Sequence, residues 1–470
     1  MTVEREAAPL ALSSTPGRWL VTVTVLASGM AFLDATAVQV ALPAIGRELD
    51  ANLSGLQWTV NSYTLTLAAL ILLGGSLGDR YGRRRIFLLG VMWFAVASLL
   101  CGLAQNTGQL VAARALQGIG GALLTPGSLA LIQSSFRHED RARAIGVWSS
   151  LSGISGLVGP FFGGLLVDAV SWRLVFLINL PIALLILAVA GRHVPESRDG
   201  GHHGRFDVAG AVLGALALGG ITYALIAAAE TFARTDVIVS AAVGVVSAVG
   251  FVVREQRTPD PMLPLGVFAD RQFSGANVAT FAVYGALGGS GLFLVLQLQN
   301  VLGYGATAAG AAMLPSILLI TLLSPRAGAL AQRIGPRLPM TLGPLTVAVG
   351  TVLLAFVDGD APYVVEILPG SILQGLGMAL TVAPLTATVL GAAPDAMAGV
   401  ASGVNNAVAR AAQLLAVAAL PVAVGLSGDD YADPAALTDG YRMATLICAA
   451  LFALGGLVSW ATIRNDVLRP

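Results

Sequence analysis

The fold of this chain is decided by the polar stretch between two long apolar runs, which reads Gly75-Ser76-Leu77-Gly78-Asp79-Arg80-Tyr81-Gly82-Arg83-Arg84-Arg85. A degenerate copy follows 253 residues later as Gly328-Ala329-Leu330-Ala331-Gln332-Arg333-Ile334-Gly335. Residues 117–123 likewise match 374–380 at an offset of 257, and 146–149 match 399–402 at 253. Glycine-rich helices resemble one another by composition, but three matches in the same order indicate two parallel copies of one unit.

The composition of the 470 residues is that of a membrane protein. Hydrophobic residues make up 56% and charged residues only 11%, against roughly 25% charged residues in an ordinary globular protein. The 26 basic residues, all arginines, balance 26 acidic ones, so no net field attracts nucleic acid. Two cysteines in apolar runs and four histidines in polar linkers predict neither a disulfide framework nor a metal site.

Fourteen apolar runs are candidate spans, since about 20 such residues cross a membrane. They must be helical, because an open strand leaves its backbone groups unsatisfied in lipid. The runs begin near Trp19, Leu56, Ile86, Thr107, Ala144, Leu174, Val208, Val237, Phe273, Thr307, Met340, Tyr363, Met397 and Tyr441. The predicted fold class is therefore an all-α membrane protein with fourteen transmembrane helices.

The arginines predict the orientation of these helices. With the N-terminus inside, most arginines fall in cytoplasmic segments and only Arg47, Arg173, Arg234 and Arg442 in external ones, as the positive-inside rule requires. The first 18 residues lack the basic region and cleavage site of a signal peptide. Both termini are thus expected in the cytoplasm. The expected location of the chain is a bacterial plasma membrane.

The repeat predicts how the helices are grouped. Two six-helix bundles, 19–190 and 273–463, enclose an inserted pair of helices at 207–254. Cytoplasmic linkers are expected at 191–206 and 255–272, and cytoplasmic tails at 1–18 and 464–470. Parallel halves of this kind predict a transporter with its site between them.

Two ionisable residues, Asp34 and Arg114, lie at comparable depth inside predicted helices. Burial disfavours a charged carboxylate and a nearby arginine favours it, so changes in water access or pairing would load and unload a proton at Asp34. Two alternatives stay open: a static structural ion pair, and an Arg114 side chain that extends to the membrane surface. Glu366, near the external end of its helix, is either interfacial or a second carboxylate for a proton or a cation.

Further polar residues are candidates for lining a central cavity. They are Asn61, Tyr63, Gln117, Asn405, Asn406, Arg410 and Gln413. For the cluster of Arg410 with Asn405, Asn406 and Gln413, hydrogen bonds between helices are the alternative.

Two motifs predict helix movement or close helix packing. In the first loop, a charge pair would hold one conformation and release another; this conformational latch comprises Gly75, Asp79, Arg80, Gly82 and Arg83. A simple positive-inside anchor explains its arginines but not Asp79. The second motif is Gly159, Pro160, Gly163 and Gly164, whose small residues permit close helix contact. Ordinary packing explains the glycines alone.

The first loop closely resembles the signature loop of the major facilitator superfamily, and the second motif resembles the one associated with its antiporters. With Asp34, Arg114, Trp58 and Asn179, these segments make residues 19–463 similar to the fourteen-helix drug:proton antiporters of the EmrB/QacA type. The resemblance implies alternating access and multidrug efflux that confers antibiotic resistance, powered by the proton gradient without a cofactor. It implies that Asp34 is a protonation site and Arg114 its partner.

The resemblance leaves the substrate open. Where some members carry further acids for dications, this chain has Asn61, Asn405, Asn406 and Arg410, so neutral, monocationic and anionic compounds all fit. The alternative function is export of one metabolite, such as an amino acid, an organic acid or a host-made natural product. A membrane sensor would need a larger soluble domain than residues 191–205. An enzyme is disfavoured, because the sequence shows no pair of a nucleophile and a base. The expected partners are substrate, protons and lipid, with a monomeric chain and no nucleic acid.

Overall fold

The structure is a computed structural model that describes residues 10–197, 207–229, 234–259, 261, 263–357, 362–392, 398–428, 430 and 433–465. Throughout these residues the regular structure is helical, apart from one isolated bridge between Leu10 and Phe136. The all-α prediction is confirmed.

The described chain contains seventeen α-helices. The first nine are α1 (Thr15–Leu49), α2 (Leu53–Tyr81), α3 (Arg83–Leu103), α4 (Thr107–Ser135), α5 (His138–Ala169), α6 (Arg173–Leu177), α7 (Asn179–His193), α8 (Val208–Ala228) and α9 (Thr235–Arg257). A 3-10 turn, η1 (Leu265–Ala269), precedes α10 (Arg271–Leu296), which continues into a π-helical turn, η2 (Gln297–Val301). The remaining helices are α11 (Ala306–Ala312), α12 (Leu314–Ile334), α13 (Arg337–Leu354), α14 (Tyr363–Glu366), α15 (Leu368–Gly391), α16 (Ala398–Ala423) and α17 (Pro434–Thr462).

These helices supply the predicted spans. Thirteen helical segments in the described chain are long and apolar enough to cross a membrane. The fourteenth is α2, which is bent by 50° between Leu53–Ile71 and Leu73–Tyr81. The short helices α6, α11 and α14 belong to the spans of α7, α12 and α15.

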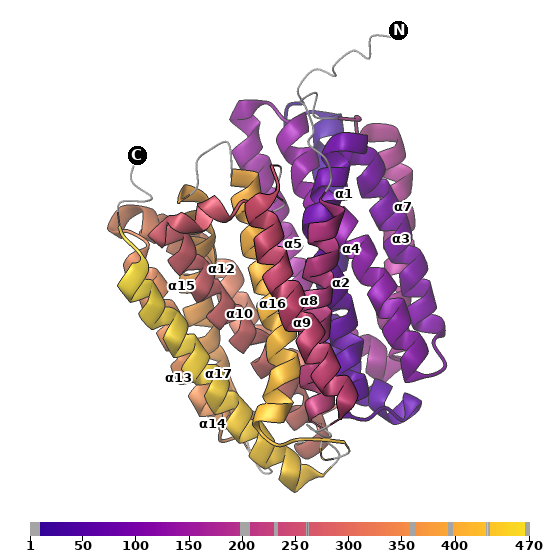
Figure 1. Cartoon of the computed structure of the whole chain (residues 1–470), viewed down its shortest axis with the longest axis vertical. Helices are drawn as coiled ribbons and strands as arrows, with labels where there is room; N and C mark the ends of the chain where they lie inside the picture. The colour runs from indigo at the N-terminus through magenta and orange to yellow at the C-terminus, as the bar shows by residue number, and fades with distance from the viewer. Residues whose placement is uncertain are drawn as a thin grey trace.

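The chain is arranged as two groups of helices with a third pair between them (Figure 1). We call α1–α7 the N-terminal half and α10–α17 the C-terminal half. Helices α8 and α9 pack on each other where Gly220 meets Gly244, and α8 also contacts α2 and α16. The pair therefore lies against both halves at one edge of their boundary.

The two halves repeat one packing arrangement. Gly90 of α3 lies against Leu123 of α4, and Gly343 of α13 lies against Leu380 of α15. The glycines that precede α3 and α13 also match, since Gly82 and Gly335 have φ of +110° and +92°. Only glycine adopts such values without strain, which explains why both copies of the loop keep it.

Candidate functional site

A cavity of about 760 Å³ lies between the two halves. Six of the predicted cavity residues line it: Asn61, Tyr63, Asn405, Asn406, Arg410 and Gln413. The lining also includes Arg114, and it extends to Asp79 and Arg83 at one end. We call the end that reaches Asp79 the open side and the other end the closed side. A cavity of this size accommodates a drug-sized molecule.

Direct hydrogen bonds join the halves on the closed side. Gln57 of α2 donates to the Val417 carbonyl of α16 (2.8 Å), and Gln299 of η2 donates to the Val40 carbonyl of α1 (2.8 Å). Asp168 at the end of α5 accepts from the backbone N–H of Ala306 (3.1 Å) and of Thr307 (2.7 Å). A shift of one half relative to the other must break these bonds.

The Asp34–Arg114 pair lies behind the wall of the cavity. Arg114 Nη1 is 2.6 Å from Asp34 Oδ2, and the two side chains are 1% and 0% exposed. The other Asp34 oxygen accepts from Gln117 (2.8 Å) and Asn179 (3.0 Å). This geometry contradicts the alternative in which Arg114 extends to the membrane surface. Buried charges require such a complete set of partners.

Gln117, a predicted cavity residue, is fully buried and lies outside the described lining of the cavity. It bridges the ion pair instead, accepting from Arg114 (2.6 Å) and donating to Ser98 (2.9 Å) as well as to Asp34. The reason is helical spacing: three residues after Arg114, Gln117 lies on the same buried face of α4.

Three further residues of this cluster were not predicted as site residues. Asn179 donates to Asp34, Ser98 accepts from Asn179 (3.2 Å), and the Thr59 carbonyl accepts from Arg114 Nε (3.1 Å). Asn179 is a lone amide in an otherwise apolar run, which was a usable signal. Ser98 and the Thr59 backbone carry no such signal.

The predicted latch residues lie at the open side. Asp79 pairs with Arg83 one turn further on (2.7 Å), within the same loop. The loop is tied to the segment after α7, where Glu196 accepts from the backbone N–H of Arg84 (3.1 Å) and Ser197 accepts from that of Arg83 (2.9 Å). Gly75 lines the cavity, Arg80 lies 5.7 Å from the ring centre of Tyr81, and Gly82 is the N-cap residue of α3. Glu196 was not predicted.

The glycine motif of α5 has two contact faces. A Cβ at Gly159 would collide with Thr36, and one at Gly163 would lie 2.6 Å from the Ala37 Cβ, so this face packs on α1. On the other face, Gly164 contacts the Ala306 backbone and Pro160 contacts Gly310. The motif therefore joins α5 to α11 of the C-terminal half on the closed side.

The two remaining charged candidates, Glu366 and Arg410, lie in different places. Glu366 ends the four-residue helix α14, is partly exposed, and lines neither of the described cavities. Its position favours the interfacial alternative. Arg410 of α16 lines the cavity, hydrogen-bonds Gln413 (3.3 Å) and lies 5.9 Å from the ring centre of Phe32.

Two repeated helical halves with a cavity between them are the arrangement of a membrane transporter. The profile of the Major Facilitator Superfamily matches residues 24–417 and 277–467. The chain belongs to this superfamily.

The chain is similar in sequence to drug and antibiotic resistance proteins. The chain is 36% identical to the puromycin resistance protein pur8 of Streptomyces alboniger, over 96% of this chain and 92% of that protein. It is 38% identical to the multidrug resistance protein Stp of Mycobacterium tuberculosis (strain CDC 1551 / Oshkosh), over 82% of this chain and 72% of that one. In fold it is similar to the inward-facing, unoccupied structure of a bacterial homologue of the human lysosomal transporter Spinster, with a TM-score of 0.67, 17% identity and coverage of 96% and 97%.

Proposed function

We propose that this chain exports antibiotics or other amphipathic small molecules across the bacterial plasma membrane in exchange for protons. The observation that carries the proposal is the buried Asp34–Arg114 pair next to a drug-sized cavity between the halves. Relatives that are named as puromycin and multidrug resistance proteins support export as its direction. The proton gradient is the energy source, and no cofactor takes part.

The proposed orientation places both termini in the cytoplasm. Arg83, Arg84 and Arg85 lie at the open side, and arginines accumulate on the cytoplasmic side of membrane proteins. The open side then faces the cytoplasm, and the cavity is ready to take up substrate from the cell.

The charge balance of the Asp34–Arg114 pair links protonation of Asp34 to the conformational change of the transporter. When Asp34 takes up a proton, Arg114 keeps its charge without a counter-charge in a buried site, which is strongly unfavourable. The paired arrangement is therefore stable only with deprotonated Asp34. Because Arg114 lines the cavity and Asp34 lies behind it, the state described here follows proton release to the cytoplasm and precedes substrate uptake.

The charges in the cavity narrow the substrate class. Arg410 contributes a positive charge at the cavity wall, and it donates a hydrogen bond to the neutral Gln413. A positive charge at the wall disfavours the binding of dications. It favours neutral compounds, or compounds with one anionic group near Arg410. This same observation supports the second candidate, an exporter of one acidic metabolite.

The test is substrate-driven proton release from energised inverted vesicles, with puromycin, a lipophilic cation, a lipophilic anion and a set of acidic metabolites as substrates. The wild type should dissipate the gradient on addition of a substrate. Asp34→Asn keeps the size of the side chain but cannot bind a proton, so it should insert normally and lose this response. pH-dependent transport that persists in Asp34→Asn would overturn the proton-site assignment. A response to acidic metabolites alone would select the second candidate.

A further inference from the structure

The buried cluster of the N-terminal half has an uncharged counterpart in the C-terminal half. Gln117 of α4 donates to Ser98 of α3 (2.9 Å), and Gln374 of α15 donates to Thr351 of α13 (3.1 Å). The offsets between these residues are 257 and 253, the same as those of the repeat. At the repeat position of Arg114 the chain has Ser371. The hydrogen bond is thus preserved while the charge is absent.

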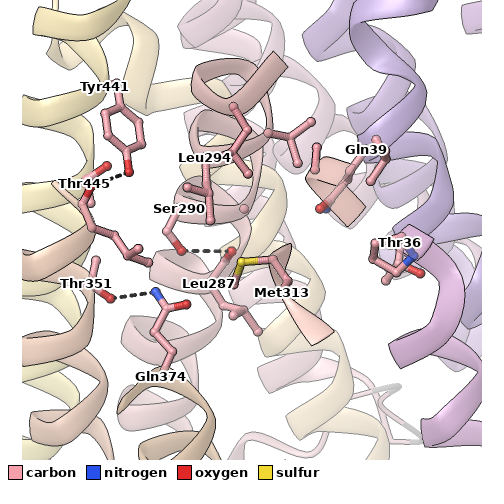
Figure 2. A pocket seen from close by; sticks show the side chains of 17 residues that line it. Thr36, Gln39, Leu287, Ser290, Leu294, Met313, Thr351, Gln374, Tyr441 and Thr445 are labelled. Carbon is pink, nitrogen blue, oxygen red and sulfur yellow. Dashed lines mark hydrogen bonds between the residues drawn. The ribbon is translucent and has the colours of Figure 1, made fainter. Parts of the chain in front are cut away.

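The C-terminal half has a cavity beside its uncharged counterpart, whereas in the N-terminal half the ion pair fills the corresponding space. A cavity of about 100 Å³, here called the inner chamber, lies beside Gln374 and Thr351. Figure 2 shows hydroxyl and amide groups from several helices around it, including Ser290, Thr445 and Gln39. None of its lining residues is charged. The volume is sufficient for several water molecules or for one small polar substituent.

One lining group keeps hydrogen-bonding capacity to spare. The Thr445 hydroxyl is buried, with the residue 3% exposed, and its partner among the described residues is the Tyr441 hydroxyl on the same helix. Since the Tyr441 hydroxyl donates to the Leu354 carbonyl (2.5 Å), Thr445 is the donor of this pair, and its own oxygen can still accept a hydrogen bond. Buried polar groups are normally satisfied, so this oxygen at the chamber wall is suited to a polar group of a bound molecule.

The inner chamber adjoins the main cavity. Thr36 and Gln39 of α1 line both spaces, so they form the boundary between them. A molecule in the main cavity therefore reaches the chamber past these two side chains. The chamber itself lies toward the closed side, next to Val40, whose carbonyl belongs to a closing hydrogen bond.

We propose that the inner chamber binds an uncharged hydroxyl, carbonyl or amide substituent of the exported molecule. The inference rests on the proposed function and deepens it. A charged substituent is excluded, because it would lose its hydration without meeting a counter-charge. Thr445 and Ser290 recognise the neutral substituent, while the bulk of the molecule stays in the main cavity.

The experiment measures binding by equilibrium dialysis of the purified protein, so that it does not depend on transport. The probes are puromycin, which carries hydroxyl and amide groups, and tetraphenylphosphonium, which carries no hydrogen-bonding group. Thr445→Val keeps the side-chain shape and removes the hydroxyl. We expect the Kd for puromycin to rise about three- to tenfold, the usual effect of one lost hydrogen bond, and that for tetraphenylphosphonium to stay unchanged.

Ser290→Leu, which fills the chamber, should weaken puromycin binding more strongly with the same selectivity. Thr346→Val is the matched control, because Thr346 lines neither cavity and its hydroxyl bonds the Leu342 carbonyl of its own helix. An unchanged Kd for puromycin in both chamber variants, equal changes for both probes, or no puromycin binding by the wild type would overturn the proposal. If the variants behave as expected but Asp34→Asn retains proton-coupled transport, the coupling assignment fails and the chamber stands.

Discussion

At the residue scale, the buried ion pair is held by position as much as by charge. Asp34 receives hydrogen bonds from α4 and α7, and Arg114 bonds α2 as well, so four helices meet at one pair of side chains. The stacking of Arg114 on Tyr63, with 4.3 Å from the guanidinium to the ring centre, fixes the guanidinium further. The pair is therefore rigid until its charge changes.

This arrangement predicts the effect of removing one partner. Arg114→Met leaves Asp34 buried without a counter-charge, so we expect a loss of about 3–5 kcal/mol in the free energy of unfolding. The double variant Asp34→Asn/Arg114→Met removes both charges and should recover much of that loss. Thermal unfolding of the purified proteins measures both values. A double variant that is no more stable than Arg114→Met would show that the ion pair is not what holds these helices.

At the element scale, α5 contacts its own half and the opposite one through a single run of small residues. Gly159 and Gly163 permit the contact with α1, and Pro160 and Gly164 the contact with α11. The backbones approach so closely there that a side chain at Gly164 has no space. Closure at this side thus depends on the absence of a Cβ atom.

The prediction at this scale is that Gly164→Val prevents closure on the closed side. The added side chain would collide with the Ala306 backbone, so transport should be lost although the protein inserts. A cysteine at Thr307 should become more accessible to a polar thiol reagent. The matched control is Gly153→Val on the same helix, where a Cβ would meet nothing within 4 Å. Transport by Gly164→Val at the wild-type rate would contradict this account of the motif.

At the scale of the whole molecule, the position of the halves depends on a few bonds across their boundary. Asp168 provides two of them, since its carboxylate accepts from two successive backbone N–H groups at the start of α11. Hydrogen bonds to a charged acceptor contribute about 1.5–3 kcal/mol each. Their number is small enough for a conformational equilibrium to depend on a single side chain.

We therefore expect Asp168→Ala to shift the population toward a state that is open on the closed side. Spin labels on the closed-side ends of α5 and α12 should report a longer mean distance by pulsed electron resonance. Asp236→Ala is the control, because that carboxylate pairs with Arg234 two residues away, outside the boundary between the halves. An unchanged distance distribution in Asp168→Ala would show that other contacts hold the closed side.

Hydrophobic runs, the repeat and the arginines determine the number of spans and the internal symmetry by themselves, because lipid imposes length and helicity on every apolar segment. The sequence also located Asp34 and Arg114, since a charge inside a span is conspicuous. It is the packing of the helices that brings Gln117 to this pair, completes it with Asn179 and Ser98, and ties the first loop to Glu196. Depth along a helix follows from the sequence, whereas the neighbour that a side chain meets depends on helix rotation and packing. The inner chamber likewise depends on packing, because its space exists only where seven α-helices from both halves meet.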